Sequence, residues 1–300
     1  MRHGVISAAL AYAMWGLFPL YFKHLGGVPS MEVVAHRIVW CLLLMVLVLS
    51  FMKRWAWLGP VLRSPKVLGA FTASALLLSA NWLTYVWAVQ HDHVLDASLG
   101  YFINPLVNVA LGFFFLHERP RPAQWLAVGL AAAGVLWLTV QTGRLPWVAL
   151  ILAASFGVYG LLRKIAVLGA LEGLVLECLV VAPVAIVALA WWGRQGHSAL
   201  NSGDAGLIGL LLLAGPLTAA PLLLFAAGAR RIPMATLGLL QYISPSLQFI
   251  LGVWLYHEPF SAARVLGFGL IWAALAVYSA EGWWRSRQPA ATLQAQGSAR

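Results

Sequence analysis

Residues 99–118 read LGYFINPLVNVALGFFFLHE, and residues 239–258 read LLQYISPSLQFILGVWLYHE. The second stretch follows the first at a fixed offset of 140 residues. Apolar matches alone can arise from composition, but a shared proline, glycine and His-Glu pair at one offset is hard to obtain by chance. The pairs are Leu99/Leu239, Ile103/Ile243, Pro105/Pro245, Leu111/Leu251, Gly112/Gly252, His117/His257 and Glu118/Glu258. The sequence therefore predicts an internal duplication.

The composition indicates that lipid covers much of this chain. Its 300 residues are 62% hydrophobic and only 9% charged, whereas soluble domains carry about 25% charged residues. The apolar runs are long enough for membrane-spanning helices, and open sheet edges are not tolerated in lipid. Turn signals separate ten predicted spans, at 4–23, 31–51, 67–90, 97–116, 122–141, 145–162, 172–192, 205–228, 235–256 and 262–281.

The duplication and the spans together predict an all-α polytopic membrane protein built from two five-helix repeats. The first repeat covers residues 4–141 and the second covers residues 145–281. Because five is an odd number, the two repeats have opposite orientations in the membrane. Inverted repeats are typical of secondary transporters, whose substrate site lies between the repeats near the midplane. A channel or a receptor has less need of such an architecture.

The distribution of lysine and arginine predicts the orientation. The net charge is +10, which in a soluble protein would suggest nucleic acid as a partner. Here most of the 19 lysines and arginines fall on one side of the ten-span map, the side that holds both chain ends. By the positive-inside rule this side is the cytoplasm. The polar tail at residues 285–300 is expected to be a disordered cytoplasmic segment.

Two charged residues lie well inside the predicted spans rather than at their ends. Arg37 lies roughly 8 Å from the outer end of its span, and Glu177 lies about five residues from the inner end of its span. They match at the 140-residue offset. Because charge in lipid is costly, both are candidates for substrate binding or gating, and Glu177 is a candidate carrier of a coupling proton. Snorkelling or local pairing is the plainer alternative.

Polar and aromatic side chains form stripes on several predicted spans. Tyr101, Asn104 and Asn108 share one helical face, and Gln241 and Gln248 occupy equivalent positions in the second repeat. Such amides either line a cavity or join helices, and the sequence leaves both readings open. The remaining candidate binding or gating residues are Tyr12, Trp15, Asn81, Tyr85, Tyr159 and Tyr242. An aromatic pocket with a few amides suits an amphipathic or aromatic solute, although aromatic packing is the plainer reading.

Other chemistry has little support in the sequence. His91, Asp92, His93 and Asp96 are potential metal ligands, but they lie in a short loop without cysteine or a fixed ligand spacing. We recognise no phosphate-binding glycine loop, nucleophile elbow or His-Glu-x-x-His helix. We therefore expect no metal, no cofactor and no enzyme activity.

Several motifs resemble one known family. They are Ala13-Met14-Trp15-Gly16-Leu17-Phe18-Pro19, Ala35-His36-Arg37-Ile38-Val39-Trp40, Asn81-Trp82, Gly100-Tyr101-Phe102-Ile103-Asn104-Pro105 and Gln241-Tyr242-Ile243-Ser244-Pro245. The pattern resembles the RarD family, in the EamA branch of the drug/metabolite transporter superfamily. The resemblance implies ten helices, a bacterial inner membrane and a permease for a small solute.

From the resemblance and the repeats we expect a secondary active transporter, more an exporter than an importer, that works by alternating access. A receptor or accessory subunit that binds a ligand without transporting it is the alternative. The expected partners are a small-molecule solute and the lipid bilayer, with protons as a candidate coupling ion. A homodimer is compatible with the sequence, and nucleic acid is not an expected partner.

Overall fold

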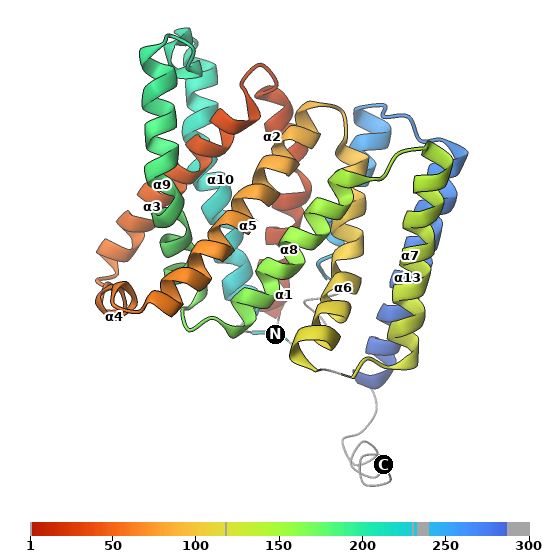
Figure 1. Cartoon of the computed structure of the whole chain (residues 1–300). Helices are drawn as coiled ribbons and strands as arrows, with labels where there is room; N and C mark the ends of the chain where they lie inside the picture. The colour runs from red at the N-terminus through yellow and green to blue at the C-terminus, as the bar shows by residue number, and fades with distance from the viewer. Residues whose placement is uncertain (1, 118, 230, 233–239, 287–300) are drawn as a thin grey trace.

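The computed structural model describes residues 2–117, 119–229, 231–232 and 240–286, and every regular element in these ranges is helical (Figure 1). The elements are α1 (Arg2–Gly16), α2 (Phe18–His24), α3 (Ser30–Phe51), α4 (Leu58–Leu62), α5 (Pro65–Gln90), α6 (Val94–Leu116), α7 (Pro122–Thr142), α8 (Trp147–Ile165), α9 (Ala170–Arg194), the 3₁₀ helix η1 (Ala199–Ser202), α10 (Ala205–Ala229), α12 (Ile243–Ile250), the π-helical η2 (Leu251–Leu255) and α13 (Ala262–Ser286).

The predicted spans correspond to these helices. Eight segments of the described chain are long and apolar enough to cross a membrane, with α1 and α2 counted together as one. Two further apolar helices, Trp147–Arg163 and Ile243–Leu255, are shorter. The predicted span 235–256 lies partly outside the described residues. The helical membrane fold is therefore confirmed, whereas the number of ten crossings stays a prediction.

The helices run back and forth between two ends of the molecule. Arg2 and Ser286 lie at one end, which we call the terminal end, together with α4 (Figure 1). The links from α2 to α3, from α5 to α6 and from η2 to α13 lie at the other end, which we call the opposite end (Figure 1). This arrangement matches an even number of passes through the bundle.

Prolines mark two local features of the spans. The first predicted span is broken between Gly16 and Phe18, where Pro19 occupies the first turn of α2. Proline fits there because the first residues of a helix need no N–H donor. Pro105 lies inside α6 without ending it, whereas Pro245 lies in the first turn of α12. The two matched prolines thus have different local roles.

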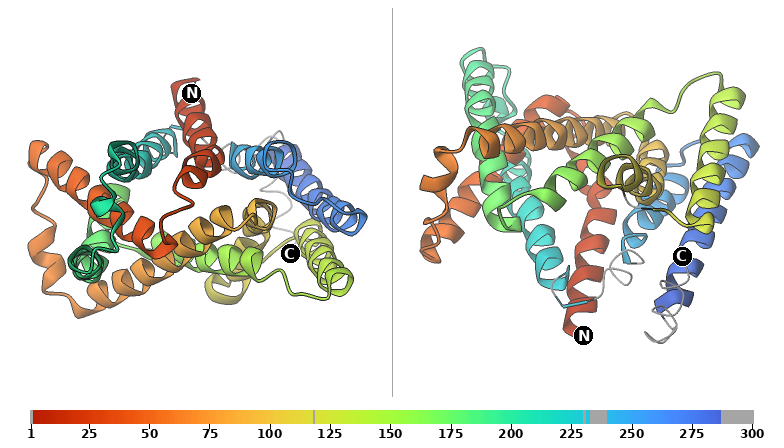
Figure 2. Two further views of the ribbon diagram at one scale, coloured as in Figure 1. Left: turned by 90° about the horizontal axis from the view of Figure 1, so that it is seen from above. Right: turned by 60° about the horizontal axis from the view of Figure 1, so that its bottom comes forward.

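Helices of the first predicted repeat pack on helices of the second. Helix α6 packs on α8 and α12 packs on α1, while α5 packs on α8 and α10 packs on α1. Helix α3 contacts both α9 and α10, and α5 contacts α9. Helices α7 and α13 form a pair at one edge of the bundle (Figure 2). Each of these contacts joins a helix before residue 142 to one after residue 147.

Helices α3 and α10 approach each other closely at one point. A Cβ atom on Gly215 of α10 would lie only 2.6 Å from the backbone oxygen of Trp40 of α3. Only glycine permits the two backbones to come so near. Thr218 lies three residues after Gly215, and Arg37 lies three residues before Trp40, so this contact brings the Thr218 and Arg37 side chains together.

Candidate functional site

Arg37 is buried at the contact between α3 and α10, with only 5% of its surface exposed. Its Nε donates a hydrogen bond to Thr218 Oγ1 at 2.8 Å. The Thr218 hydroxyl donates in turn to the backbone oxygen of Ala214, one turn earlier. That bond uses the hydroxyl hydrogen and leaves an oxygen lone pair directed at the guanidinium. Thr218 therefore fixes the orientation of Arg37.

Three aromatic rings surround the guanidinium. Its carbon lies 4.2 Å from the ring centre of Trp82, 5.5 Å from that of Phe18 and 5.7 Å from that of Phe22. These are cation–π distances, which stabilise a desolvated cation. We call Arg37, Thr218, Trp82, Phe18 and Phe22 the arginine cage.

A row of aromatic side chains leads from the arginine cage to Glu177. Successive ring centres are separated by 5.9 Å for Phe22 and Tyr85, 5.8 Å for Tyr85 and Tyr101, 6.2 Å for Tyr101 and Phe156, and 5.7 Å for Phe156 and Tyr159. The Tyr159 hydroxyl then donates to Glu177 Oε2 at 3.5 Å. Helices of both repeats contribute to this row, which connects the surroundings of Arg37 to those of Glu177.

Glu177 is buried on α9 and has local partners. Ser74 Oγ donates to Glu177 Oε1 at 2.5 Å, and the Arg163 guanidinium lies 3.9 Å from the same oxygen. Arg37 and Glu177 thus have separate partners, although they occupy matching positions in the two repeats. The pairing with Arg163 agrees with the plainer reading of Glu177, and it leaves a role in proton transfer as a prediction.

The predicted amide residues join helices. Asn81 Nδ2 donates to the backbone oxygen of Leu152 and to Ser155 Oγ, and Asn81 Oδ1 accepts from Tyr101. Asn104 Nδ2 donates to the backbone oxygen of Ala153, and Asn108 donates to Asn104. Gln248 donates to the backbone oxygen of Trp15 and to Ser244 Oγ. The amide donors are thus used in contacts between or along helices.

The other predicted residues lie apart from the arginine cage. Tyr12, Trp15 and Phe225 form an aromatic cluster between α1 and α10, with ring centres 5.5 to 5.8 Å apart. Gln241 and Tyr242 lie half-buried in the turn before α12, and Tyr242 packs against the hydrophobic cluster of α6, α7 and α13. The structure therefore brings together Arg37, Tyr85, Tyr101, Tyr159, Asn81 and Glu177.

Sequence reasoning missed four members of the arginine cage as candidate site residues, namely Thr218, Trp82, Phe18 and Phe22. Thr218 stands as a lone hydroxyl in a strongly apolar run, beside Pro216, and this was the available signal. Trp82 directly follows Asn81, but the many tryptophans of the chain hide its role. Ser74, the donor to Glu177, gives no distinctive pattern.

Little free space remains at this site. A cavity of about 10 Å³ lies between Trp82 of the arginine cage, Glu177 and Cys178. A volume of this size holds a single water molecule. This cavity is too small to hold a solute.

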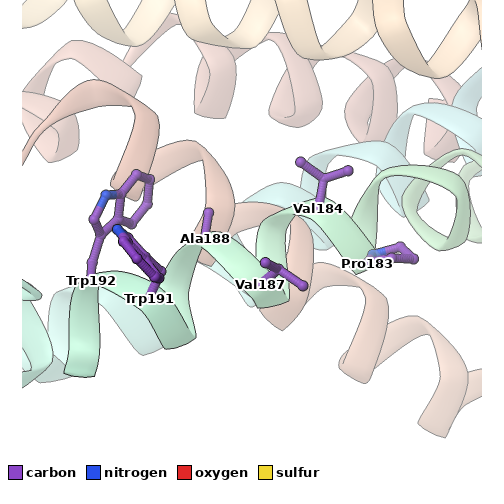
Figure 3. A pocket seen from close by; sticks show the side chains of 6 residues that line it. All are labelled: Pro183, Val184, Val187, Ala188, Trp191 and Trp192. Carbon is purple, nitrogen blue, oxygen red and sulfur yellow. The ribbon is translucent and has the colours of Figure 1, made fainter. Parts of the chain in front are cut away.

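A second hollow lies on the outside of the bundle. A groove of about 540 Å³ runs along α9 past Pro183, Val187 and Trp191 (Figure 3). One helix supplies all of its lining side chains, which are apolar or aromatic. Such a surface suits lipid chains and lacks the converging polar groups of a substrate pocket.

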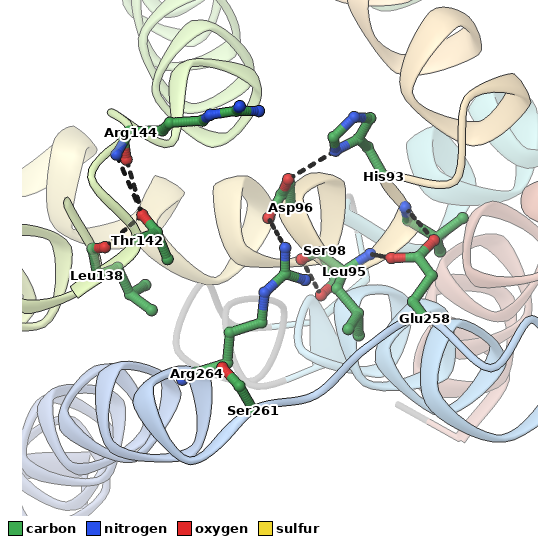
Figure 4. A network of polar contacts seen from close by, with 11 residues as sticks. His93, Leu95, Asp96, Ser98, Leu138, Thr142, Arg144, Glu258, Ser261 and Arg264 are labelled. Atoms are coloured by element: carbon green, nitrogen blue, oxygen red, sulfur yellow. Dashed lines mark hydrogen bonds and ion pairs between the residues drawn. The ribbon is translucent and has the colours of Figure 1, made fainter.

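A polar network joins the repeats at the opposite end (Figure 4). The Glu258 carboxylate accepts hydrogen bonds from the backbone N–H groups of Val94 at 2.6 Å and Leu95 at 2.9 Å, at the start of α6. Arg264 lies 3.5 Å from Asp96, which also contacts His93. Burial raises the pKa of the Glu258 carboxyl, although the two N–H donors act in the other direction.

Three of the four residues considered as metal ligands take part in ion pairs, and His91 contacts the backbone oxygen of Trp87. Asp92 pairs with Lys23, and Asp96 pairs with Arg264 and His93. In the part of the chain that the structure describes, no three His, Cys, Asp or Glu side chains gather in a metal-binding group.

The chain is similar to a family of transporters and to several of its members. The model of the EamA-like transporter family matches residues 2–140 and again residues 145–280. An uncharacterized transporter of Bacillus subtilis, YojE, is 46% identical over 93% of this chain and 94% of its own length. Protein RarD of Escherichia coli is 43% identical over 92% and 94% of the two chains.

A more distant relative and one solved structure agree with this assignment. The chloramphenicol-sensitive protein RarD of Pseudomonas aeruginosa is 32% identical over 91% of this chain and 92% of its own length. A crystal structure with 19% sequence identity superposes with a TM-score of 0.61 over 96% of this chain and 98% of that chain, which shows a shared fold. The chain therefore belongs to the EamA-like transporter family, and within it to the RarD family.

Proposed function

We propose that this multi-pass protein of the bacterial inner membrane is a secondary active transporter that exports a small metabolite or drug-like solute by alternating access, without chemistry on its substrate. The family assignment establishes a membrane transporter in general terms. The observation that carries the proposal is the aromatic row between Arg37 and Glu177, which contains side chains from both repeats. Export, rather than import, rests on the family resemblance alone.

Contacts between the repeats at both ends support an alternating mechanism. At the opposite end Glu258 binds the start of α6, and Arg264 pairs with Asp96. At the terminal end, Arg54, just before α4, pairs with Glu172. Arg121 pairs with Glu281, near the end of α13. Opening one set while the other stays closed would expose the site to one side at a time. Alternating access in inverted-repeat transporters is largely such a movement of one repeat against the other.

The helix pairs support the proposed division into two inverted repeats, 4–141 and 145–281. Under the 140-residue correspondence, the packing of α6 on α8 corresponds to that of α12 on α1. The packing of α5 on α8 corresponds likewise to that of α10 on α1. Contacts that recur in this way are expected when two similar halves enclose a site at their interface.

We further propose that the terminal end faces the cytoplasm. The α4 region, at the terminal end, lies within a basic stretch that includes Lys53, Arg54, Arg63 and Lys66. Arginines 119 and 121 lie in the link between α6 and α7. By the positive-inside rule such a concentration of basic residues marks the cytoplasmic side.

Purified protein in liposomes tests the transport proposal. A panel of candidate solutes is first screened by thermal stabilisation in detergent, because a ligand that binds only the folded state raises its apparent stability. Uptake of the stabilising solutes is then measured with and without a pH gradient. Flux above that of protein-free liposomes supports a transporter, and acceleration by the gradient supports proton coupling. Binding without any flux would favour the receptor alternative.

A further inference from the structure

We propose that Arg37 binds the carboxylate of the transported solute, so that the substrate class is amphipathic organic monocarboxylates. This inference rests on the proposed transport function and specifies the substrate of the same site. It follows from the charges that surround Arg37, from its hydrogen-bond donors and from the aromatic rings beside it.

The acidic side chains that the structure describes are engaged elsewhere. Glu32 accepts from Ser198 and the backbone N–H of Ala199, Glu172 pairs with Arg54, Glu177 with Arg163, Glu281 with Arg121, Asp92 with Lys23, and Asp96 with Arg264. Glu258 binds the start of α6, and Asp204 accepts from the first N–H groups of α10. Within the described ranges, no carboxylate forms an ion pair with Arg37.

Arg37 is unusual among the basic residues. It is the one Lys or Arg side chain that is buried among those whose burial the structure describes. The aromatic rings attract the cation through their quadrupoles, but they carry no counter-charge. A buried charge without a partner is strongly unfavourable, and a ligand of opposite charge would remove that cost. The arginine cage therefore favours an anion.

The donors of Arg37 suit a planar anion. Nε donates to Thr218, whereas the two terminal nitrogens have no hydrogen bond to any described side chain or backbone group. A guanidinium binds a carboxylate through two parallel N–H donors, and Thr218 holds this fork in one orientation. Tyr85 packs edge-on against Phe22 of the arginine cage, with ring centres 5.9 Å apart, and its buried hydroxyl lacks a hydrogen-bond partner among the described residues.

The surroundings select among anions. A single buried guanidinium balances one negative charge, whereas a phosphate dianion would keep an uncompensated charge in an apolar site. Trp82, Phe22 and Tyr85 present rings rather than further cations. A solute with one carboxylate and an apolar or aromatic body matches both features, because its body packs on the rings while its charge meets Arg37.

Matched probes test the proposal on the whole protein in detergent. The probes are phenylacetate, hydrocinnamate and octanoate, each compared with its primary amide, together with phenethylammonium and inorganic phosphate. Thermal stabilisation is measured against probe concentration. We expect at least one carboxylate to stabilise the protein while its amide, the amine and phosphate do not. The proposal would be overturned if each acid stabilised the protein no more than its amide does, or if none of the carboxylates stabilised it.

Variants locate the binding. We expect Arg37→Gln to weaken carboxylate binding by at least about thirtyfold, because removing one partner of a buried charge pair abolishes most of its energy. Arg37→Lys retains the charge but loses the fork, and should bind with intermediate affinity. Arg144→Gln, at an exposed loop residue, serves as the control and should bind as the unmodified protein does. Unchanged binding by a folded Arg37→Gln protein would contradict the assignment.

The substrate proposal and the transport proposal can fail separately. Arg37-dependent binding of a carboxylate without flux in liposomes would retain the anion site and reject transport. Flux of uncharged solutes that is the same in Arg37→Gln would retain transport and reject the anion site. If Arg37→Gln does not fold, the comparison of acids with amides on the unmodified protein decides the question.

Discussion

The carboxylate of Glu258 accepts a hydrogen bond from the backbone N–H of Val94, 164 residues earlier in the chain. This contact binds the link between η2 and α13 to the start of α6. A carboxylate at a helix N-terminus satisfies free N–H groups and interacts favourably with the helix dipole. The proposed alternating mechanism would require this contact to be released when the opposite end opens.

The Glu258 contact predicts a pH effect on stability. Burial raises the pKa of Glu258 in the folded state above its unfolded value. Its contribution is then fully present below the unfolded pKa and is lost as pH rises through the folded pKa. We therefore expect the stability of Glu258→Gln, relative to the unmodified protein, to increase with pH from about 4.5 upward. Melting temperatures of both proteins, measured across pH 4 to 8 in one detergent, check this.

Removal of the Glu258 side chain tests its role as an N-terminal cap of α6. Glu258→Ala leaves two N–H groups at the start of α6 without acceptors and should lower the free energy of unfolding by about 0.5–2 kcal/mol. The neighbouring Ser261→Ala provides a comparison in the same loop, since Ser261 accepts only a long hydrogen bond, at 3.4 Å from Arg264 N. Equal effects of the two substitutions would argue against a special role for the Glu258 cap.

Thr218 is predicted to stabilise the protein through Arg37. Thr218→Val keeps the shape of the side chain but leaves the buried Nε–H of Arg37 without its acceptor, at a cost of about 1–3 kcal/mol. Thr139→Val is the matched control, because the Thr139 hydroxyl also donates to the backbone one turn earlier, at Val135. Chemical unfolding of both variants should show that Thr218→Val lowers the free energy of unfolding more than Thr139→Val does.

The contact between Gly215 and Trp40 predicts a steric effect. A Cβ on residue 215 would overlap the Trp40 backbone, so Gly215→Ala should force α10 away from α3 and destabilise the protein by about 1–3 kcal/mol. Gly209 lies on the same helix with open space beside it. Gly209→Ala should therefore be neutral or stabilising, by up to about 1 kcal/mol, because alanine favours helices. Thermal unfolding of the two variants makes the comparison.

Glu177 is predicted to couple transport to protons. In Glu177→Gln the titratable group is lost, while Ser74 and Tyr159 can still contact the amide. We expect solute accumulation driven by a pH gradient to fall to the level of protein-free liposomes, whereas exchange of labelled for unlabelled solute continues. Gradient-driven accumulation that persists in this variant would exclude the role. Thr139→Ala, which removes a hydroxyl of α7 that bonds to Val135 in its own helix, serves as the control.

The sequence predicted the candidate residues better than it predicted their contacts. Arg37 and Glu177 stood out because charge is rare in apolar spans, and both are buried in the structure. The amides Asn81, Asn104 and Gln248 were equally visible, but only the structure shows that their donors join helices. Thr218 could not be paired with Arg37 from the sequence, because 181 residues separate them.

The sequence by itself determined the class of fold, because long apolar runs in lipid have to form helices whose backbone groups bond internally. The matching of residues 99–118 with residues 239–258 also exposed the duplication without any coordinates. Only the tertiary structure decided which side chains meet between the helices. Glycine at position 215 permits a close approach of α10 to α3 that places Thr218 beside Arg37, and the packing of α5 on α3 places Trp82 there as well. Such contacts depend on helix packing across the whole chain, which no local pattern encodes.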